Sequence, residues 1–138
     1  IPECNELIDK MRAKLELKDY KIAKLYFRMK DFAASITTFH NILQEFPETI
    51  HREEILFLVI KSYAKYASQS VKEKQYERFT NTTIAFQDFY KEFPASKFAG
   101  EAADLNEKSR AEIQKMVDKN KNLIEEQSKR VRLKRNGL

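Results

Sequence analysis

The sequence predicts an all-α fold built from stacked helix-turn-helix repeats, and three observations support this prediction. The 138 residues include only two glycines and three prolines, so few positions favour turns. Long stretches rich in Lys, Glu, Ala, Leu and Gln favour helix. Two segments, one around Pro47 and one around Pro94, match each other and indicate an internal repeat. The sequence contains no run of about 18 apolar residues, so it does not predict a membrane-spanning helix.

Two helix boundaries define the repeat. Residues 46–49 read FPET and residues 93–96 read FPAS. Proline cannot continue a helix, so each segment ends one. We expect the hydroxyls of Thr49 and Ser96 to cap the helices that follow. A glutamate in the next first turn, Glu54 or Glu101, suits the positive end of the helix dipole. Each segment therefore predicts a tight connection between two helices.

The apolar pattern predicts five helices, in order residues 3–29, 32–46, 50–68, 71–92 and 96–130. The second and fourth carry phenylalanines at matching helical spacing, so we expect Phe39 and Phe86 to be buried in equivalent places. The third is expected to be the most buried, because residues 55–60 are all apolar. The first presents Ala23, Tyr26 and Phe27 on one face and ends at a short turn.

The order of small, aromatic and proline residues resembles the tetratricopeptide repeat. It reads Ala23, Tyr26, Phe32, Ser35, Phe39 and Pro47. A unit of that family has about 34 residues, so the spacing between Pro47 and Pro94 implies an insertion. We place it at residues 68–76, where Ser70 and Glu73 form a capping-box pattern that predicts longer helices rather than a loop. The expected architecture is an α-solenoid with a long C-terminal helix.

A narrower resemblance covers residues 3–113. The segments LIDKMRAKLELKDYKIAKLYF and AFQDFYKEFP, both proline boundaries and the insertion look like the BamD family of outer-membrane β-barrel assembly lipoproteins, in its Bacteroidetes-like form. The resemblance is to the C-terminal half of such a protein. The family's signal sequence, lipid anchor and first repeats are expected to be absent from this chain.

This resemblance implies a protein-binding scaffold at the periplasmic face of the outer membrane. The partners it implies are periplasmic domains of the barrel-assembly subunit and unfolded outer-membrane proteins. Contact with the membrane would come only through the absent lipid anchor. Because two repeats are fewer than usually make a stable stack, we also expect the chain to self-associate through Leu7, Ile8, Met11 and Leu15.

The residue pattern predicts neither an enzyme nor a cofactor or metal protein. His40 and His51 have no partner at a metal-ligand spacing, so we expect His51 to lie on the surface of a first helical turn and His40 to face solvent or another helix. Two glycines cannot form a phosphate-binding loop. No serine or cysteine lies in a motif that pairs it with a base. Cys4 is the single cysteine, and we expect it to be a half-buried thiol at the start of a helix.

The sequence also predicts a division into residues 1–113, which hold the two repeats, and residues 114–138, a basic helical extension that is frayed at its end. Beyond residue 113 an apolar seam continues with steps of four and three, the spacing of a coiled coil. The last 12 residues hold five cations and no acid, while the rest of the chain is neutral. The residues expected to dock a partner are Ile113, Val117, Ile124, Lys129, Arg130, Arg132, Lys134 and Arg135.

Two other functions remain open at this point. The basic tail could bind nucleic acid or another acidic surface, although it contains no aromatic residues for stacking and we do not expect nucleic acid. A cytosolic tetratricopeptide adaptor would clamp peptide C-termini with cations and amides on its concave face. No such clamp can be assigned from the sequence.

Overall fold

The computed structural model describes residues 1–137, and this part of the chain folds into five helices without a β-strand. The helices are α1 (Pro2–Arg28), α2 (Phe32–Glu45), α3 (Arg52–Ser68), α4 (Lys72–Glu92) and α5 (Ala99–Arg135). The all-α, tetratricopeptide-like fold with a long last helix is therefore confirmed. No helix of residues 1–137 combines the length and the apolar character that crossing a bilayer requires.

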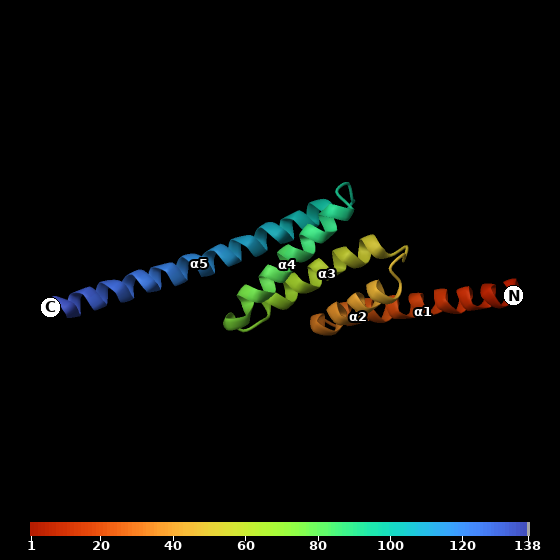
Figure 1. Cartoon of the computed structure of the whole chain (residues 1–138), viewed down its shortest axis with the longest axis horizontal. Helices are drawn as coiled ribbons and strands as arrows, with labels where there is room; N and C mark the ends of the chain where they lie inside the picture. The colour runs from red at the N-terminus through yellow and green to blue at the C-terminus, as the bar shows by residue number, and fades with distance from the viewer. Residues whose placement is uncertain (138) are drawn as a thin grey trace.

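Consecutive helices run antiparallel and pack side by side (Figure 1). Short connections force this arrangement because they leave no room for a crossover. Residues 29–31 connect α1 to α2. Lys30 adopts a left-handed backbone with φ of 63°, and the Asp31 side chain accepts a hydrogen bond from the Ala34 N–H at 3.2 Å. The N-terminal part of α1 and the C-terminal half of α5 project beyond the bundle in opposite directions (Figure 1).

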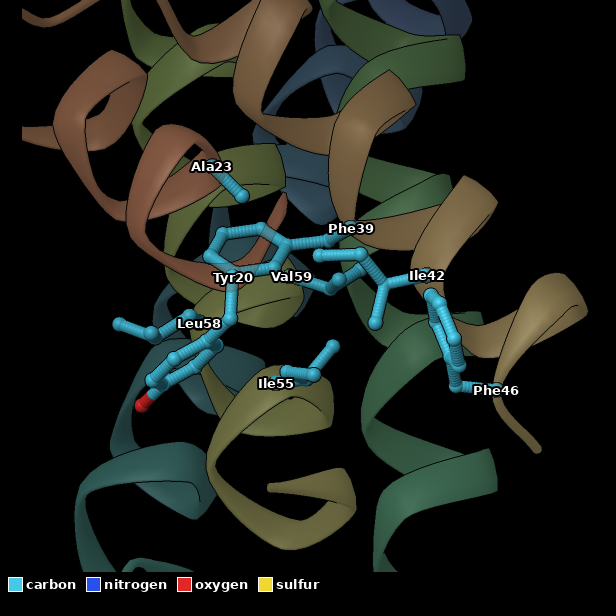
Figure 2. Packing of buried hydrophobic residues seen from close by; sticks show 8 residues of the cluster. All are labelled: Tyr20, Ala23, Phe39, Ile42, Phe46, Ile55, Leu58 and Val59. Atoms are coloured by element: carbon cyan, nitrogen blue, oxygen red, sulfur yellow. The ribbon is translucent and has the colours of Figure 1, made fainter. Parts of the chain in front are cut away.

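The first part of the core lies between α1, α2 and α3. The ring of Phe39 reaches from α2 toward Ala23 of α1, and both side chains are fully buried (Figure 2). Other buried members of this cluster come from all three helices, so α1 and α2 form one hairpin with α3 packed across it. They are Tyr20, Ile42, Phe46, Ile55, Leu58 and Val59.

The second part of the core joins α3, α4 and α5. Its buried members are Phe57 and Ile60 of α3, Phe89 of α4 and Ala102 of α5. Helix α3 therefore contributes one face to each half of the core. This double burial explains why its residues 55–60 are uniformly apolar, as the sequence predicts.

The same junction occurs twice along the stack. Tyr20 stacks on His51 with ring centroids 4.0 Å apart, and Phe57 stacks on Phe98 at 4.5 Å. Phe57 follows Tyr20 by 37 residues, and Phe98 follows His51 by 47 residues. The two offsets differ by ten residues, so ten extra residues lie between them. They form the end of α3, the turn at 69–71 and the start of α4. The insertion lengthens two helices, as predicted.

The local capping predictions were wrong in detail. Helices α3 and α5 begin at Arg52 and Ala99, later than expected, because residues 47–51 and 94–98 form turns. The hydroxyls of Thr49 and Ser96 stabilise these turns by accepting hydrogen bonds from N–H groups two residues on, at 3.2 and 3.1 Å. Ser70 does not cap α4, because its hydroxyl donates to the Tyr66 carbonyl at 2.5 Å.

Two burial predictions also need correction. Phe86 is half-buried whereas Phe39 is fully buried, because Phe86 lies at the edge of the α4–α5 contact, where it lines an open hollow and stacks on the exposed ring of Tyr90. Cys4 is exposed, because the first turns of α1 lie beyond the end of α2 (Figure 1). Helix α5 continues to Arg135, about five residues past the expected end, since the first strong helix breaker is Gly137.

Candidate functional site

The junction between α1 and α3 holds two ionisable groups with shifted pKa values, Tyr20 and Glu54. The Tyr20 hydroxyl donates a hydrogen bond to the Glu54 carboxylate, and Lys24 pairs with the same carboxylate at 3.3 Å. Burial, followed by the hydrogen bond to Glu54 and its charge, raises the pKa of Tyr20 well above its usual range. Burial alone would raise the pKa of Glu54, but hydrogen bonds from Tyr20 and Lys24 lower it on balance.

These contacts join elements of the fold and leave little room for a substrate. Glu54 faces a tyrosine ring, a lysine and His51, which itself stacks on Tyr20. His51 was expected to lie on the surface of a first helical turn, but it is half-buried as part of this stack. His40 contacts the Tyr63 hydroxyl at 3.1 Å, an inter-helix contact that fits expectation. Residues 1–137 contain no group of His, Cys, Asp and Glu side chains that could hold a metal ion.

The predicted docking residues lie along the outer half of α5. Ile113 is half-buried, whereas 44% of Val117 and 57% of Ile124 are exposed. Every described residue from Val117 onward is exposed, so this part of α5 has no packing partner within residues 1–137. The structure therefore places the seam on a free helix, while α5 itself continues without a break across the expected domain boundary at 113. Leu138, the last residue of the predicted extension, lies outside the described residues.

The five tail cations crowd into the last two turns of this free helix. Lys129, Arg130, Arg132, Lys134 and Arg135 are all exposed, and none of them takes part in an ion pair within residues 1–137. Three of them lie in the last turn, where positive charge suits the negative end of the helix dipole. Helix α5 spans about 55 Å at 1.5 Å per residue, so the cations lie far from the repeat core.

Sequence reasoning missed a groove on the α4–α5 pair that is separate from the surface around Phe86. It runs between the end of α3, the start of α4 and the middle of α5, and two adjoining hollows of about 540 and 460 Å³ form it. The hollows adjoin at Gln75 and Glu112, which line both of them. Five lysines line it, namely Lys65, Lys72, Lys108, Lys115 and Lys119. Lysines from three helices could not be grouped without the fold, although the insertion at 68–76 marked one wall.

Two other hollows lie near residues that the sequence analysis singled out. One lies between α4 and α5 where Tyr76, Phe86 and Ile113 line it, which places the first residue of the predicted seam beside the half-buried ring. The other follows the outer face of α1, where Leu17, Ile22 and Leu25 lie among basic residues. The expected self-association residues Leu7, Ile8, Met11 and Leu15 are all at least half exposed on the same helix.

Residues 2–79, more than half of the chain, match the family model YfiO, described as outer membrane lipoprotein. The chain belongs to this outer membrane lipoprotein family. No curated protein matches the chain. The family match ends at Phe79 of α4. Part of the lysine-lined groove and the whole projecting half of α5 therefore lie outside the matched residues.

Proposed function

We propose that the chain is a scaffold in the assembly of outer-membrane β-barrel proteins, acting at the periplasmic face of the outer membrane. Membership of the outer membrane lipoprotein family supports this location over a cytosolic adaptor. The repeat architecture supports binding, because stacked helix pairs present extended surfaces on which other proteins dock. Its partners are periplasmic domains of the barrel-assembly subunit, with unfolded outer-membrane proteins as a second class.

The projecting half of α5 is the docking element in this proposal. A free helix that carries exposed Val117, Ile124 and Val131 along one seam leaves apolar area in water unless a partner covers it. The cations at its end add attraction to an acidic surface, which speeds association and fixes orientation. This observation carries the proposal, because a purely structural helix would not need an apolar seam beyond the core.

The test measures binding of the full chain to purified periplasmic domains of the barrel-assembly subunit. Replacing Val117 and Ile124 with Ser should weaken binding at least about tenfold, since each loses about 1 kcal/mol or more of burial. Replacing the five tail cations with Gln should weaken binding mainly at low salt. Neither variant should change the melting temperature appreciably, because these side chains are exposed in the free protein.

A matched control separates the tail from general charge. Replacing five exposed cations of α1 (Lys10, Lys14, Lys18, Lys21 and Arg28) with Gln removes the same charge. An equal loss of binding in this control would contradict docking through α5, as would full binding by the seam variant.

Self-association is a second, weaker element of the proposal. The surface proposed for it is the exposed stripe of Leu7, Ile8, Met11 and Leu15 on α1. Adjacent apolar side chains on one helix favour contact with another helix. Sedimentation should then show association at high concentration that is lost when Leu7 and Met11 become Ser.

A further inference from the structure

The groove between α3, α4 and α5 has an apolar floor and a basic rim. Phe79 and Ala64 form part of the floor and are less than a tenth exposed, and Leu105 is half-buried beside them. Further along α5, Met116 and Leu123 extend the apolar strip. Leu105 and Leu123 are separated by 18 residues of helix, which corresponds to a groove length of about 27 Å.

The rim has a strong excess of positive charge. Besides Lys65, whose ammonium lies over the Phe32 ring, four lysines line the groove together with a single acid, Glu112, which pairs with Lys115 at 3.4 Å. Lys72, Lys108 and Lys119 are exposed and take part in no ion pair within residues 1–137. Three uncompensated ammonium groups around an apolar strip are unfavourable for the isolated protein but suit an anionic occupant.

The equivalent surface of the first hairpin is covered differently, and comparing the two hairpins shows how the groove of the second hairpin arises. Phe32 corresponds to Phe79, but the Lys65 ammonium lies over the Phe32 ring at 5.9 Å. The position equivalent to Lys65 in α5 is Glu112, which pairs with Lys115 instead. The extra residues at the α3–α4 connection then add Ser68, Lys72 and Gln75 as a wall. The insertion thus builds the groove.

We propose that this groove binds an acidic segment of a partner protein, with carboxylates at the lysine rim and apolar side chains on the floor. A groove of about 27 Å accommodates roughly eight residues of extended chain. The charge of the rim calls for Asp and Glu in the segment, and the apolar floor calls for residues such as Leu or Phe between them. This site lies on a different face of α5 from Ile113 and the seam, and it does not depend on the function proposed for the tail.

The groove chemistry favours a peptide over nucleic acid or lipid. Among the lining residues no exposed aromatic ring is available for bases to stack on, since Phe79 is buried. No arginine lines it, so it lacks the fork geometry that matches phosphate best. Lysine on a flexible stem instead adapts to carboxylates spaced along a chain.

The experiment is selection of a phage-displayed random dodecamer library on the full chain. We expect enriched peptides to combine acidic with apolar residues, and the best of them is then measured as a fluorescein-labelled peptide by anisotropy. Replacing Lys72, Lys108 and Lys119 with Glu should weaken binding of that peptide at least about tenfold, because close charge pairs at interfaces have effects of this size. Circular dichroism melts check that the variant remains folded.

The matched control replaces Lys14, Lys18 and Lys21 on the outer face of α1 with Glu, which changes the net charge equally. The peptide affinity of this control should stay within about twofold of the native value. The same result is expected for the variant in which Gln replaces the five tail cations. Equal weakening by groove and control variants overturns the proposal, and so does a selection without acidic enrichment. A last measurement is co-sedimentation of the chain with phosphatidylglycerol vesicles. If vesicle binding depends on the groove lysines and peptide binding does not, the groove binds lipid and the proposal is also overturned.

Discussion

The two junctions of the stack share one geometry and use different chemistry. At the first, Tyr20 stacks on His51 with the rings 7° from parallel, and at the second Phe57 stacks on Phe98 at 8°. Lys24 pairs with Glu54 at the first junction, and its counterpart Lys61 pairs with Glu101 at 3.2 Å. The conserved element is the shape of the flat aromatic stack, whereas its polarity changes from one junction to the next.

A hydroxyl-to-carboxylate contact repeats in the same way. Thr49 donates to Glu16 across the first junction, and Ser96 donates to Glu53 across the second. These hydroxyls also hold the turn before each following helix. One side chain therefore fixes both the turn and the angle at which the next helix packs. The repeat is specified by a few polar contacts at each connection as well as by its apolar core.

The two hairpins differ more in what covers them. Phe39 lies among side chains of α1, α2 and α3, whereas Phe86 stacks on the exposed ring of Tyr90 and lines an open hollow. Packing that is closed on every side gives the first hairpin more stability per side chain. The second hairpin leaves surface free on both sides of α4, and that surface is available for partners.

The largest expected effect tests this difference in cover. Phe39→Ala should lower the free energy of unfolding by about 3–5 kcal/mol, because it opens a cavity in closed packing. Phe86→Ala should cost roughly half as much or less, since the half-buried ring leaves a dent that water can fill. Urea denaturation of both variants measures the comparison. Equal losses would mean that the two hairpins are closed to the same degree.

An exchange of the junction aromatics should have a smaller effect. Tyr20→Phe removes the hydroxyl that donates to Glu54 and should cost about 1 kcal/mol, because the carboxylate is partly solvated. The reverse change, Phe57→Tyr, places a hydroxyl near Glu101, the counterpart of Glu54, and should cost less than about 1 kcal/mol. Urea midpoints decide this. A severe loss for Phe57→Tyr would show that the second junction accepts only an apolar ring.

Much of this architecture follows from the sequence, because helical periodicity and proline boundaries are local signals. Pro47 and Pro94 located both connections, and the ladder through Phe39 located the first core. What failed depends on neighbours distant in sequence. The exposure of Phe86 depends on which helix lies beyond α4, and the stacking of His51 depends on Tyr20, 31 residues earlier.

The candidate surfaces divide in the same way. The sequence places Val117 and Ile124 on one helix at heptad spacing, and both side chains are exposed, while their role in docking a partner stays a prediction. The groove could not be predicted, because Lys65, Lys72 and Lys108 meet only after three helices pack. The sequence does indicate the insertion that builds one wall, but not the charge that collects around it.

The smallest expected effect concerns acid and again distinguishes the first junction. The folded-state pKa of Glu54 is lowered, despite the opposing effect of burial, because Tyr20 and Lys24 donate to the carboxylate. The unfolded chain therefore binds this proton more readily than the folded protein does. The resulting stabilisation is fully present above the ordinary glutamate pKa of about 4.3 and is lost as pH falls through the lower folded value. Because the Lys24 and Glu54 side chains are more than a third exposed, it should stay below about 1 kcal/mol.

Urea midpoints at pH 6 and pH 3 measure this contribution as the difference between the native chain and Glu54→Gln. The variant should lose less stability on acidification, because it no longer carries the carboxylate whose protonation opposes folding. Glu92→Gln is the matched comparison, since hydrogen bonding from Arg52 is the main cause that lowers the pKa of Glu92 at an exposed site between α3 and α4. Both variants should flatten the acid response, and Tyr20→Phe should flatten it partly by removing one donor to Glu54. If the native chain and Glu54→Gln lose equal stability between the two pH values, the contacts of Glu54 give the first junction no stability that the second junction, with Phe57 in place of Tyr20, lacks.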